Sequence, residues 1–443
     1  MSKPKKIEIR QDELFRDRLS NQLNPKHPLF ILSNQINWKK FEDEFSSLYQ
    51  SELGYPPNAV RLMIGLMMLQ HTEGLSDEQV VMKWIENPYY QYFCGYDHFQ
   101  WNFPIHPSSL TRWRHRIGKE GVEKILAETI CVSLRIGHST EKDLQQTIVD
   151  TTVMEKAIAH PTDSKLLNRC REKLVDLAKN NGVVLRQSYR RVGNTAFIKS
   201  CCYGRAGQFK RMHKQVKKLK TYLGRVTRDI ERKDGENVVP IFKDLIDKAN
   251  RLIAQEKNSK NKLYSLHAPE VECISKGKAH KRHEFGCKAS LVTTHKQGLA
   301  LSLQALHGNP YDGHTLKSSL DHAEKMSGIK IERSFVDLGY KKHGVENVQI
   351  IMSKQKRLTN SLKRALKRRN AIEPHIGHMK NEGKLGRNYL KGIIGDALNA
   401  LLVGVGHNLR LILSFIKKLF AFLRMLLWLE NFKNYHTNAN PIT

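Results

Sequence analysis

Apolar positions in the first third of the chain follow helical spacing. In the segment 58–70 they fall close to one helical face, and Ser76 with Gln79 three residues later has the pattern of a capping box. A further helix is expected from Pro107 and Ser108, ending at Gly118. These patterns predict an all-helical N-terminal domain over residues 1–140.

The pattern then changes to strands. Residues 147–153 are a β-branched run typical of a buried strand, with Asp150 near its middle. Residues 285–294 and 299–306, joined by a turn, predict a hairpin, and 331–337 predict a further short strand. Asp312 is expected to cap a helix near 315–325. Strands mixed with helices indicate an α/β domain.

The charge of the chain points to a polyanionic partner. The 443 residues contain 74 Lys and Arg against 43 Asp and Glu, for a net charge of +31. Nucleic acid is the polyanion best matched to such an excess, because phosphate contacts release counterions. A ribosome-associated protein or one that meets acidic lipid is the alternative.

The surplus is dense in a helical stretch with little strand character, residues 166–270, which we interpret as a basic helical insertion. Lys214, Lys217 and Lys218 lie in its most basic run and are expected to contact the DNA backbone without base specificity. A merely solvated helix face is the alternative.

Neither the cysteines nor the termini indicate secretion or a membrane. The seven cysteines form no C-x-x-C pair, so we expect reduced, mostly buried thiols and no zinc ribbon. The N-terminus has no signal-peptide core. The apolar stretch 392–430 is interrupted by charges, which favours a buried or amphipathic helix over a membrane span. We expect a soluble, cytoplasmic, nucleoid-associated prokaryotic protein.

The basic helix expected to begin near Ser108 presents Arg112, Arg114 and Arg116. Short helices followed by one dense in arginine are similar to a helix-turn-helix module whose last helix enters the major groove. A plain helical bundle with a solvated basic face fits equally well, and the sequence leaves both open.

Three carboxylates form the candidate catalytic constellation. Asp150 and Asp337 each lie in or directly after a short strand, and Glu373 lies in the first turn of a helix with Asn370 as its expected N-cap. If the two strands are neighbours, the two aspartates lie close together and repel unless a cation separates them. Oxygen ligands alone favour Mg²⁺, with Mn²⁺ as an alternative. The sequence therefore predicts a two-metal site for phosphodiester chemistry.

Basic residues flank Glu373. Arg369 and Lys380 fall on its helical face, with Gly377 leaving room for a DNA strand, and Lys380 and His378 are expected to touch phosphate oxygens.

At this point the chain resembles the DDE transposases of bacterial insertion sequences, in the IS-five-like branch. The resemblance rests on the segments 149–153 with 158–164, 308–315, 336–340 and 372–380. That family's signature is Tyr, Arg, Glu and Lys spaced by two, three and six residues. Arg369, Glu373 and Lys380 fit it, but Leu366 occupies the Tyr position.

The resemblance implies a ribonuclease-H-like mixed sheet with helices, split into residues 141–165 and 271–400 by the insertion 166–270 and followed by C-terminal helices over 401–443. It implies Mg²⁺-dependent cleavage that frees 3′-hydroxyls and joins them to target DNA. It also implies DNA element ends and target DNA as partners, a homodimer or higher assembly on paired ends, and no small-molecule substrate. Two other functions stay open: a non-catalytic repressor derived from a transposase, and a structure-selective nuclease without strand transfer.

Overall fold

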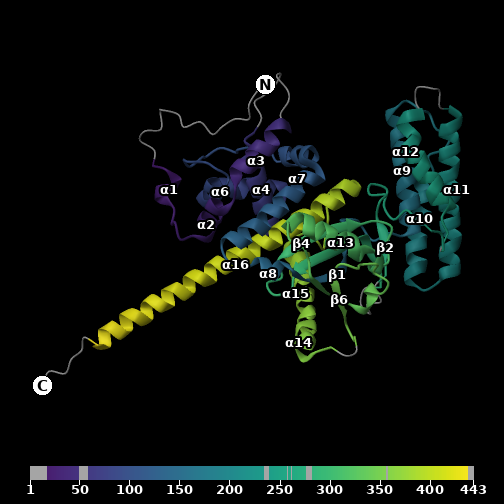
Figure 1. Cartoon of the computed structure of the whole chain (residues 1–443). Coiled ribbons are helices and arrows are strands. Elements are labelled where there is room, and N and C mark those ends of the chain that lie inside the picture. Colours follow the sequence, from purple (N-terminus) through teal and green to yellow (C-terminus); the bar gives the residue numbers. More distant parts are fainter. Residues whose placement is uncertain are drawn as a thin grey trace.

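The computed structural model of the chain describes residues 17–48, 58–233, 239–256, 258–260, 262–275, 282–355 and 358–437. Figure 1 shows three parts: an N-terminal group of helices, a mixed sheet with helices around it, and a separate helical insertion. A long C-terminal helix, α16, runs through the first two parts.

The N-terminal part is helical, as predicted. Its elements are α1 (Leu19–Gln22), α2 (Pro28–Gln35), α3 (Trp38–Phe45), η2 (Ser46–Leu48), α4 (Val60–Glu73), α5 (Asp77–Glu86), α6 (Pro88–Phe93), α7 (Ser108–Arg135) and α8 (Glu141–Leu144). The predicted capping box is confirmed, because the side chains of Ser76 and Gln79 each accept a hydrogen bond from the other's backbone N–H. The predicted stop at Gly118 is confirmed as a break, because its φ of 59° and ψ of −166° are non-helical; a second helical stretch, included in α7, continues from there to Arg135.

One sheet of six strands forms the centre of the molecule. The strands are β1 (Gln146–Glu155), β2 (Glu272–Ile274), β3 (Glu284–Thr294), β4 (Ala300–Leu306), β5 (Arg333–Val336) and β6 (Gln349–Met352). The order is β2-β3-β1-β5-β6, with β4 also paired to β3. Pairing is antiparallel among β1, β2, β3 and β4 and parallel from β1 through β5 to β6.

The predicted strands are all present, including the antiparallel hairpin of β3 and β4, whereas β2 and β6 were not predicted. Helices cover both faces of the sheet: α13 (Asp312–Ser327) contacts β3 and β4, and α15 (Ile372–Glu382) contacts β1. The remaining elements are η3 (Leu338–Tyr340), α14 (Asn360–Arg368) and η4 (Arg369–Ala371). Asp312 is the first residue of α13 and Tyr311 its N-cap, so the predicted capping role of Asp312 is wrong.

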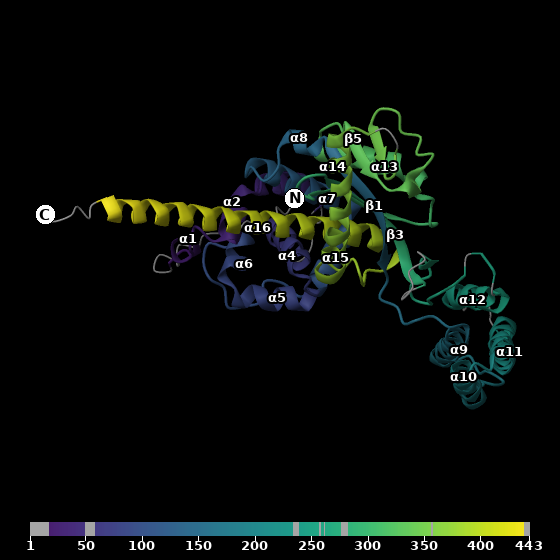
Figure 2. The same cartoon turned by 90° about the horizontal axis from the view of Figure 1, so that it is seen from below.

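The insertion consists of four helices with a core of their own. They are α9 (Asp163–Asn180), α10 (Arg190–Arg205), α11 (Phe209–Lys233) and α12 (Val239–Ala254). Leu174, Leu223 and Phe242 are fully buried among them. Figures 1 and 2 both show this bundle standing beside the sheet and joined to it through β1 and β2.

The C-terminal segment is a single helix of 46 residues, α16 (Gly392–Thr437). Its first half packs on α4, α7 and β4, and its second half projects away from the body in both views. The predicted division between residues 400 and 401 falls inside this helix. Within the described residues, no helix has the length and apolar character needed to cross a membrane.

The cysteines agree only in part with the expectation. Among the described residues all seven thiols are free, as predicted. Cys94, Cys170 and Cys287 are buried, but Cys201 and Cys202 are exposed, so the expectation of mostly buried thiols is wrong for the latter pair.

Candidate functional site

The strands that carry Asp150 and Asp337 are neighbours. β1 and β5 run parallel, with Ile148 opposite Phe335. Continuing this register by two residues places Asp150 level with Asp337, which directly follows β5. Since neighbouring strands lie about 4.8 Å apart, the two carboxylates leave adjacent points of the backbone. The condition on which the sequence prediction depended is therefore met.

Hydrogen bonds hold the carboxylate of Asp337 in its charged form. Its Oδ1 accepts a 2.7 Å bond from the Ser353 hydroxyl, just after β6. This bond, assisted by the Leu338 backbone N–H and the charges of Arg369 and Lys354, lowers the pKa of Asp337. On the neighbouring strand, Oδ1 of Asp150 accepts a 2.8 Å bond from the backbone N–H of Thr151.

A third aspartate approaches the same place. Burial raises the pKa of Tyr340 well above its ordinary value, and the charges of Asp150, Asp312 and Asp337 add to the rise. Asp312 Oδ1 accepts a 3.1 Å bond from the Thr151 hydroxyl, so it lies directly beside β1.

Asp312 has its own counter-charge. The Lys288 ammonium, 7% exposed, donates to Asp312 Oδ1 at 3.0 Å and to the Pro310 carbonyl at 2.6 Å. Sequence reasoning missed this pair, although a signal was present: Lys288 is the one charged residue in the strand segment 285–292. A buried ammonium requires a partner.

Glu373 does not converge with the aspartates on one point. It is the second residue of α15, which contacts β1, and its side chain is exposed. Among the described residues, the three predicted carboxylates do not form a group whose ligand atoms all lie within 4.8 Å of one another. The predicted capping box is wrong, because the N-cap of α15 is Ala371 and makes no side-chain cap. Asn370 instead lies in η4, which separates α14 from α15.

The basic residues around Glu373 have different surroundings. Arg369 lies in η4, close enough to Asp337 to lower the pKa of that carboxyl. Lys380 Nζ lies 3.6 Å from Glu284 at the start of β3. Exposed His378 lies 2.8 Å from Glu382 on the same helix. Lys380 and His378 thus already have acidic neighbours within the chain.

The three arginines of α7 do not share one surface. Arg112 and Arg116 are exposed, but Arg114 is 4% exposed and forms an ion pair with Asp77. Its Nη1 donates to Asp77 at 3.0 Å and to Gln70 at 3.3 Å. The expectation that Arg114 contacts DNA is corrected, because its guanidinium is already committed to fixing α7 against α4 and α5.

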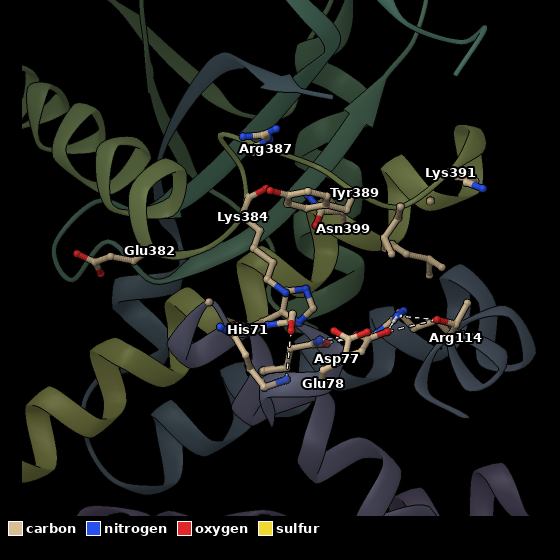
Figure 3. Close-up of a pocket in the computed structure, with 18 of the residues that line it drawn as sticks. His71, Asp77, Glu78, Arg114, Glu382, Lys384, Arg387, Tyr389, Lys391 and Asn399 are labelled. Carbon is tan, nitrogen blue, oxygen red and sulfur yellow. Dashed lines mark hydrogen bonds and ion pairs between the residues drawn. The ribbon is translucent and has the colours of Figure 1, made fainter. Parts of the chain in front are cut away.

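A cleft of about 840 Å³ separates these N-terminal helices from the segment that follows α15 (Figure 3). Figure 3 shows Lys384 extending from that segment toward His71 and Asp77, with Arg387 and Tyr389 on the same segment. Burial lowers the pKa of Lys384 to about 8. Arg387 lies over the ring of Tyr389, 5.5 Å from its centroid, and that ring is 64% exposed. The basic side chains that line the cleft are His71, Arg114, His115, Lys380, Lys384, Arg387 and Lys391.

The insertion presents its lysines on α11. Lys214, Lys217 and Lys218 are exposed, as a DNA contact would require. Lys220 differs, because its ammonium donates a 2.7 Å bond to the Gln255 carbonyl at the end of α12.

Comparisons with known proteins identify the family. Residues 17–116, from the start of the described chain to α7, match the family "Transposase domain (DUF772)". A protein of Rhizobium meliloti, "Uncharacterized protein ORF8 in nfe locus", is 44% identical over 207 residues, which are 47% of this chain and 100% of the relative. The chain belongs to a transposase family. No solved structure gives a significant match to this transposase-family chain.

Proposed function

We propose that the chain is a DNA transposase that binds the ends of a mobile element, cleaves phosphodiester bonds to free 3′-hydroxyls, and joins these to target DNA. The observation that carries the proposal is the parallel β1–β5 register, whose continuation by two residues brings Asp150 level with Asp337. The transposase-domain match over residues 17–116 supports it independently.

The strand order supports a ribonuclease-H-like sheet of the IS-five-like DDE branch. β1 is central, with antiparallel β3 and β4 on one side and parallel β5 and β6 on the other. The insertion α9–α12 leaves the sheet after β1 and returns before β3. Such a sheet brings the middle of β1 and the end of β5 together, where two carboxylates can share one ligand.

The donor set fits a hard divalent cation. Asp150, Asp337 and Glu373 offer only oxygen, which suits Mg²⁺ or Mn²⁺. Asp337 is kept ionised by Ser353 and Arg369. The side chain of Glu373 makes no hydrogen bond or ion pair with any residue the structure describes, so it is available to a ligand. Bound Mg²⁺ would supply charge neutralisation at phosphorus and activation of the attacking hydroxyl.

The remaining roles belong to positive side chains. Arg369, beside Asp337, orients a phosphate at the reacting strand. Exposed Arg112 and Arg116 of α7 and the α11 lysines hold flanking DNA through its backbone. Arg387 and Tyr389 on the cleft wall offer a charge and an exposed ring, the combination that holds single-stranded or distorted DNA.

Assembly of two copies is part of the proposal. The projecting half of α16 exposes apolar side chains at helical spacing, among them Leu419, Phe422, Leu423 and Leu426. A second copy packing there would cover this stripe. Substituting Phe422 and Leu426 with Glu should convert a dimer to a monomer in light scattering; an unchanged mass would reject this part of the proposal.

Nicking of element-end DNA in Mg²⁺ tests the catalytic assignment. D150N, D337N and E373Q should each lower the cleavage rate by at least 10³-fold while end binding stays within about threefold. D321N, an exposed carboxylate on α13, serves as the matched control and should leave both unchanged. Metal-dependent cleavage that survives one of the first three substitutions removes that residue from the site.

One observation favours a second candidate, the non-catalytic repressor derived from a transposase. The side chain of Glu373 is exposed, and the three carboxylates do not converge. Tight end binding with no nicking in Mg²⁺ or Mn²⁺ would select it. A structure-selective nuclease would cut, yet give no joined product from pre-cut ends and target plasmid.

A further inference from the structure

A cluster of side chains of metal-ligating type lies where the insertion joins the sheet, away from Asp150 and Asp337. Cys287 of β3, His307 directly after β4 and Asp396 of α16 each offer a ligand atom, and these atoms all lie within 4.8 Å of one another. Cys287 is 1% and Asp396 3% exposed. The β3–β4 hairpin and the start of α16 therefore bring sulfur, nitrogen and oxygen to one largely buried point.

The imidazole of His307 is oriented between two carboxylates. Its Nε2 lies 3.5 Å from Asp396 Oδ2, and its Nδ1 lies 3.8 Å from Glu272 Oε1 in β2. Nε2 is buried and makes no hydrogen bond. A metal-ligating histidine has this environment: one nitrogen faces the ion and the other faces an acidic group that fixes the tautomer.

The charges around the cluster require a cation. Lys156, the residue after β1, contacts Asp396 Oδ1 at 2.7 Å and Glu270 Oε1 at 2.8 Å. Two carboxylates thus share this one ammonium, and a third, Glu272, faces only His307 among the basic side chains. All four side chains are at least three-quarters buried, and uncompensated charge at such depth is costly. Either a metal ion or a proton on His307 can supply the missing positive charge.

We propose that Cys287 Sγ, His307 Nε2 and Asp396 Oδ2 bind one Zn²⁺ ion, with Glu272 facing the far nitrogen of His307 at 3.8 Å. The thiol ligand selects zinc over Mg²⁺, which prefers oxygen alone. Two ligands at about 2.0–2.2 Å from a tetrahedral zinc lie roughly 3.3–3.5 Å apart, and Nε2 and Oδ2 are 3.5 Å apart before any adjustment. On binding, the Cys287 thiol releases its proton to solvent and the thiolate takes its place on the ion.

The position of this zinc site, defined by Cys287, His307 and Asp396, gives it a structural role. Lys156 marks where the chain leaves the sheet for the insertion, and Glu270 and Glu272 mark where it returns. The ion ties both connections to the start of α16. Its occupancy should therefore set how firmly the basic bundle α9–α12 is held against the sheet. This role is independent of Asp150, Asp337 and Glu373.

Zinc binding to the full-length protein, first stripped with a chelator and then dialysed against Zn²⁺, tests the proposal. Elemental analysis should give about one zinc per chain for the wild type and for C170S, a buried cysteine in the insertion core. C287S and H307Q should lose the ion, and E272Q should bind it about 10–100-fold more weakly. D150N should keep it, so that failure here is distinct from failure of the proposed transposase site.

Cobalt gives a readout that reports the thiolate ligand itself. The Co²⁺-loaded wild type should show a thiolate-to-cobalt absorption band in the near ultraviolet, absent from C287S and present in C170S. Binding should release one proton from the thiol. Absence of stoichiometric zinc in the wild type, or full retention in C287S, would overturn the proposal and leave protonated His307 as the missing charge.

Discussion

The Ser353 hydroxyl donates a 2.7 Å hydrogen bond to Asp337 across the adjacent ends of the parallel strands β6 and β5. This bond is the largest cause of the low pKa of Asp337, so removing it should raise that pKa. In S353A the pKa of Asp337 should rise toward its ordinary value. The carboxylate then protonates at a higher pH, and the acid limb of metal-dependent cleavage moves upward in pH.

The check is a pH–rate profile of nicking for the wild type and S353A. S327A is the control, because the Ser327 hydroxyl bonds only to backbone groups: it donates to the Ala323 and Ile329 carbonyls and accepts from the Ile329 N–H. A carboxyl group whose pKa is lower in the folded than in the unfolded protein stabilises the fold at pH values above its unfolded-state pKa. This stabilisation is lost as the pH falls through its folded-state pKa. Asp337 is exposed, so the effect on stability should be small. An unshifted acid limb in S353A would show that Asp337 does not control it.

The sequence predicted the parts of this site that depend on local pattern. The β-branched run around Asp150 and the apolar run before Asp337 both form strands. The strand β6, which ends directly before Ser353, was not predicted. Its four residues include only one buried side chain, so they show no alternation of apolar and polar positions. Its role becomes visible only when its parallel pairing with β5 is known.

Tertiary partners explain the remaining errors. Arg114 looks the same as Arg112 in sequence, and only the folded contact with Asp77, 37 residues away, distinguishes them. Likewise Asp312 follows a turn sequence typical of a cap, yet its carboxylate serves Lys288 and Thr151. A contact with a residue far away in the sequence does not change the spacing of apolar and polar positions. Spacing alone therefore predicted the wrong role for these side chains.

The two arginines of α7 should therefore separate stability from DNA binding. R114A leaves the partly buried Asp77 without its ion-pair partner and should lower the free energy of unfolding by about 3 kcal/mol. R112A removes an exposed side chain and should change stability by less than about 0.5 kcal/mol. Urea unfolding measures the stability of both variants. Titration with element-end DNA measures the binding affinity, which R112A should lower. DNA affinity unchanged in R112A would remove this residue from the proposed interface.

The lysines of the insertion should act through charge alone. Replacing Lys214, Lys217 and Lys218 with Gln should weaken binding equally for specific and unrelated DNA. The slope of log affinity against log salt should flatten by about 0.9 for each phosphate that these lysines no longer neutralise. K220Q is the matched control: it should destabilise the insertion, because its ammonium holds the Gln255 carbonyl, and should change the slope least. If the slope of log affinity against log salt stayed the same in the triple variant, these lysines of α11 would face solvent and not contact DNA.

Two glycines on α16 should respond in opposite ways to the same substitution. A Cβ on Gly406 would lie 2.1 Å from the His71 carbonyl oxygen of α4, whereas a Cβ on Gly404 would meet only side-chain carbons at 3.4 Å or more. Alanine is favoured over glycine inside a helix by about 1 kcal/mol. G404A should thus be neutral or raise stability by up to about that amount.

G406A gains the same helical preference but forces α16 away from α4, and overpacking of this kind costs roughly 1–3 kcal/mol. We expect a net loss, seen as a lower urea midpoint with an unchanged slope. The Arg410 guanidinium, which donates to the His71 and Thr72 carbonyls at 2.9 and 3.0 Å, would be displaced with the helix. If G406A proved as stable as G404A, the close approach of α16 to α4 would be wrong, and with it the fixed placement of the N-terminal helices against the sheet.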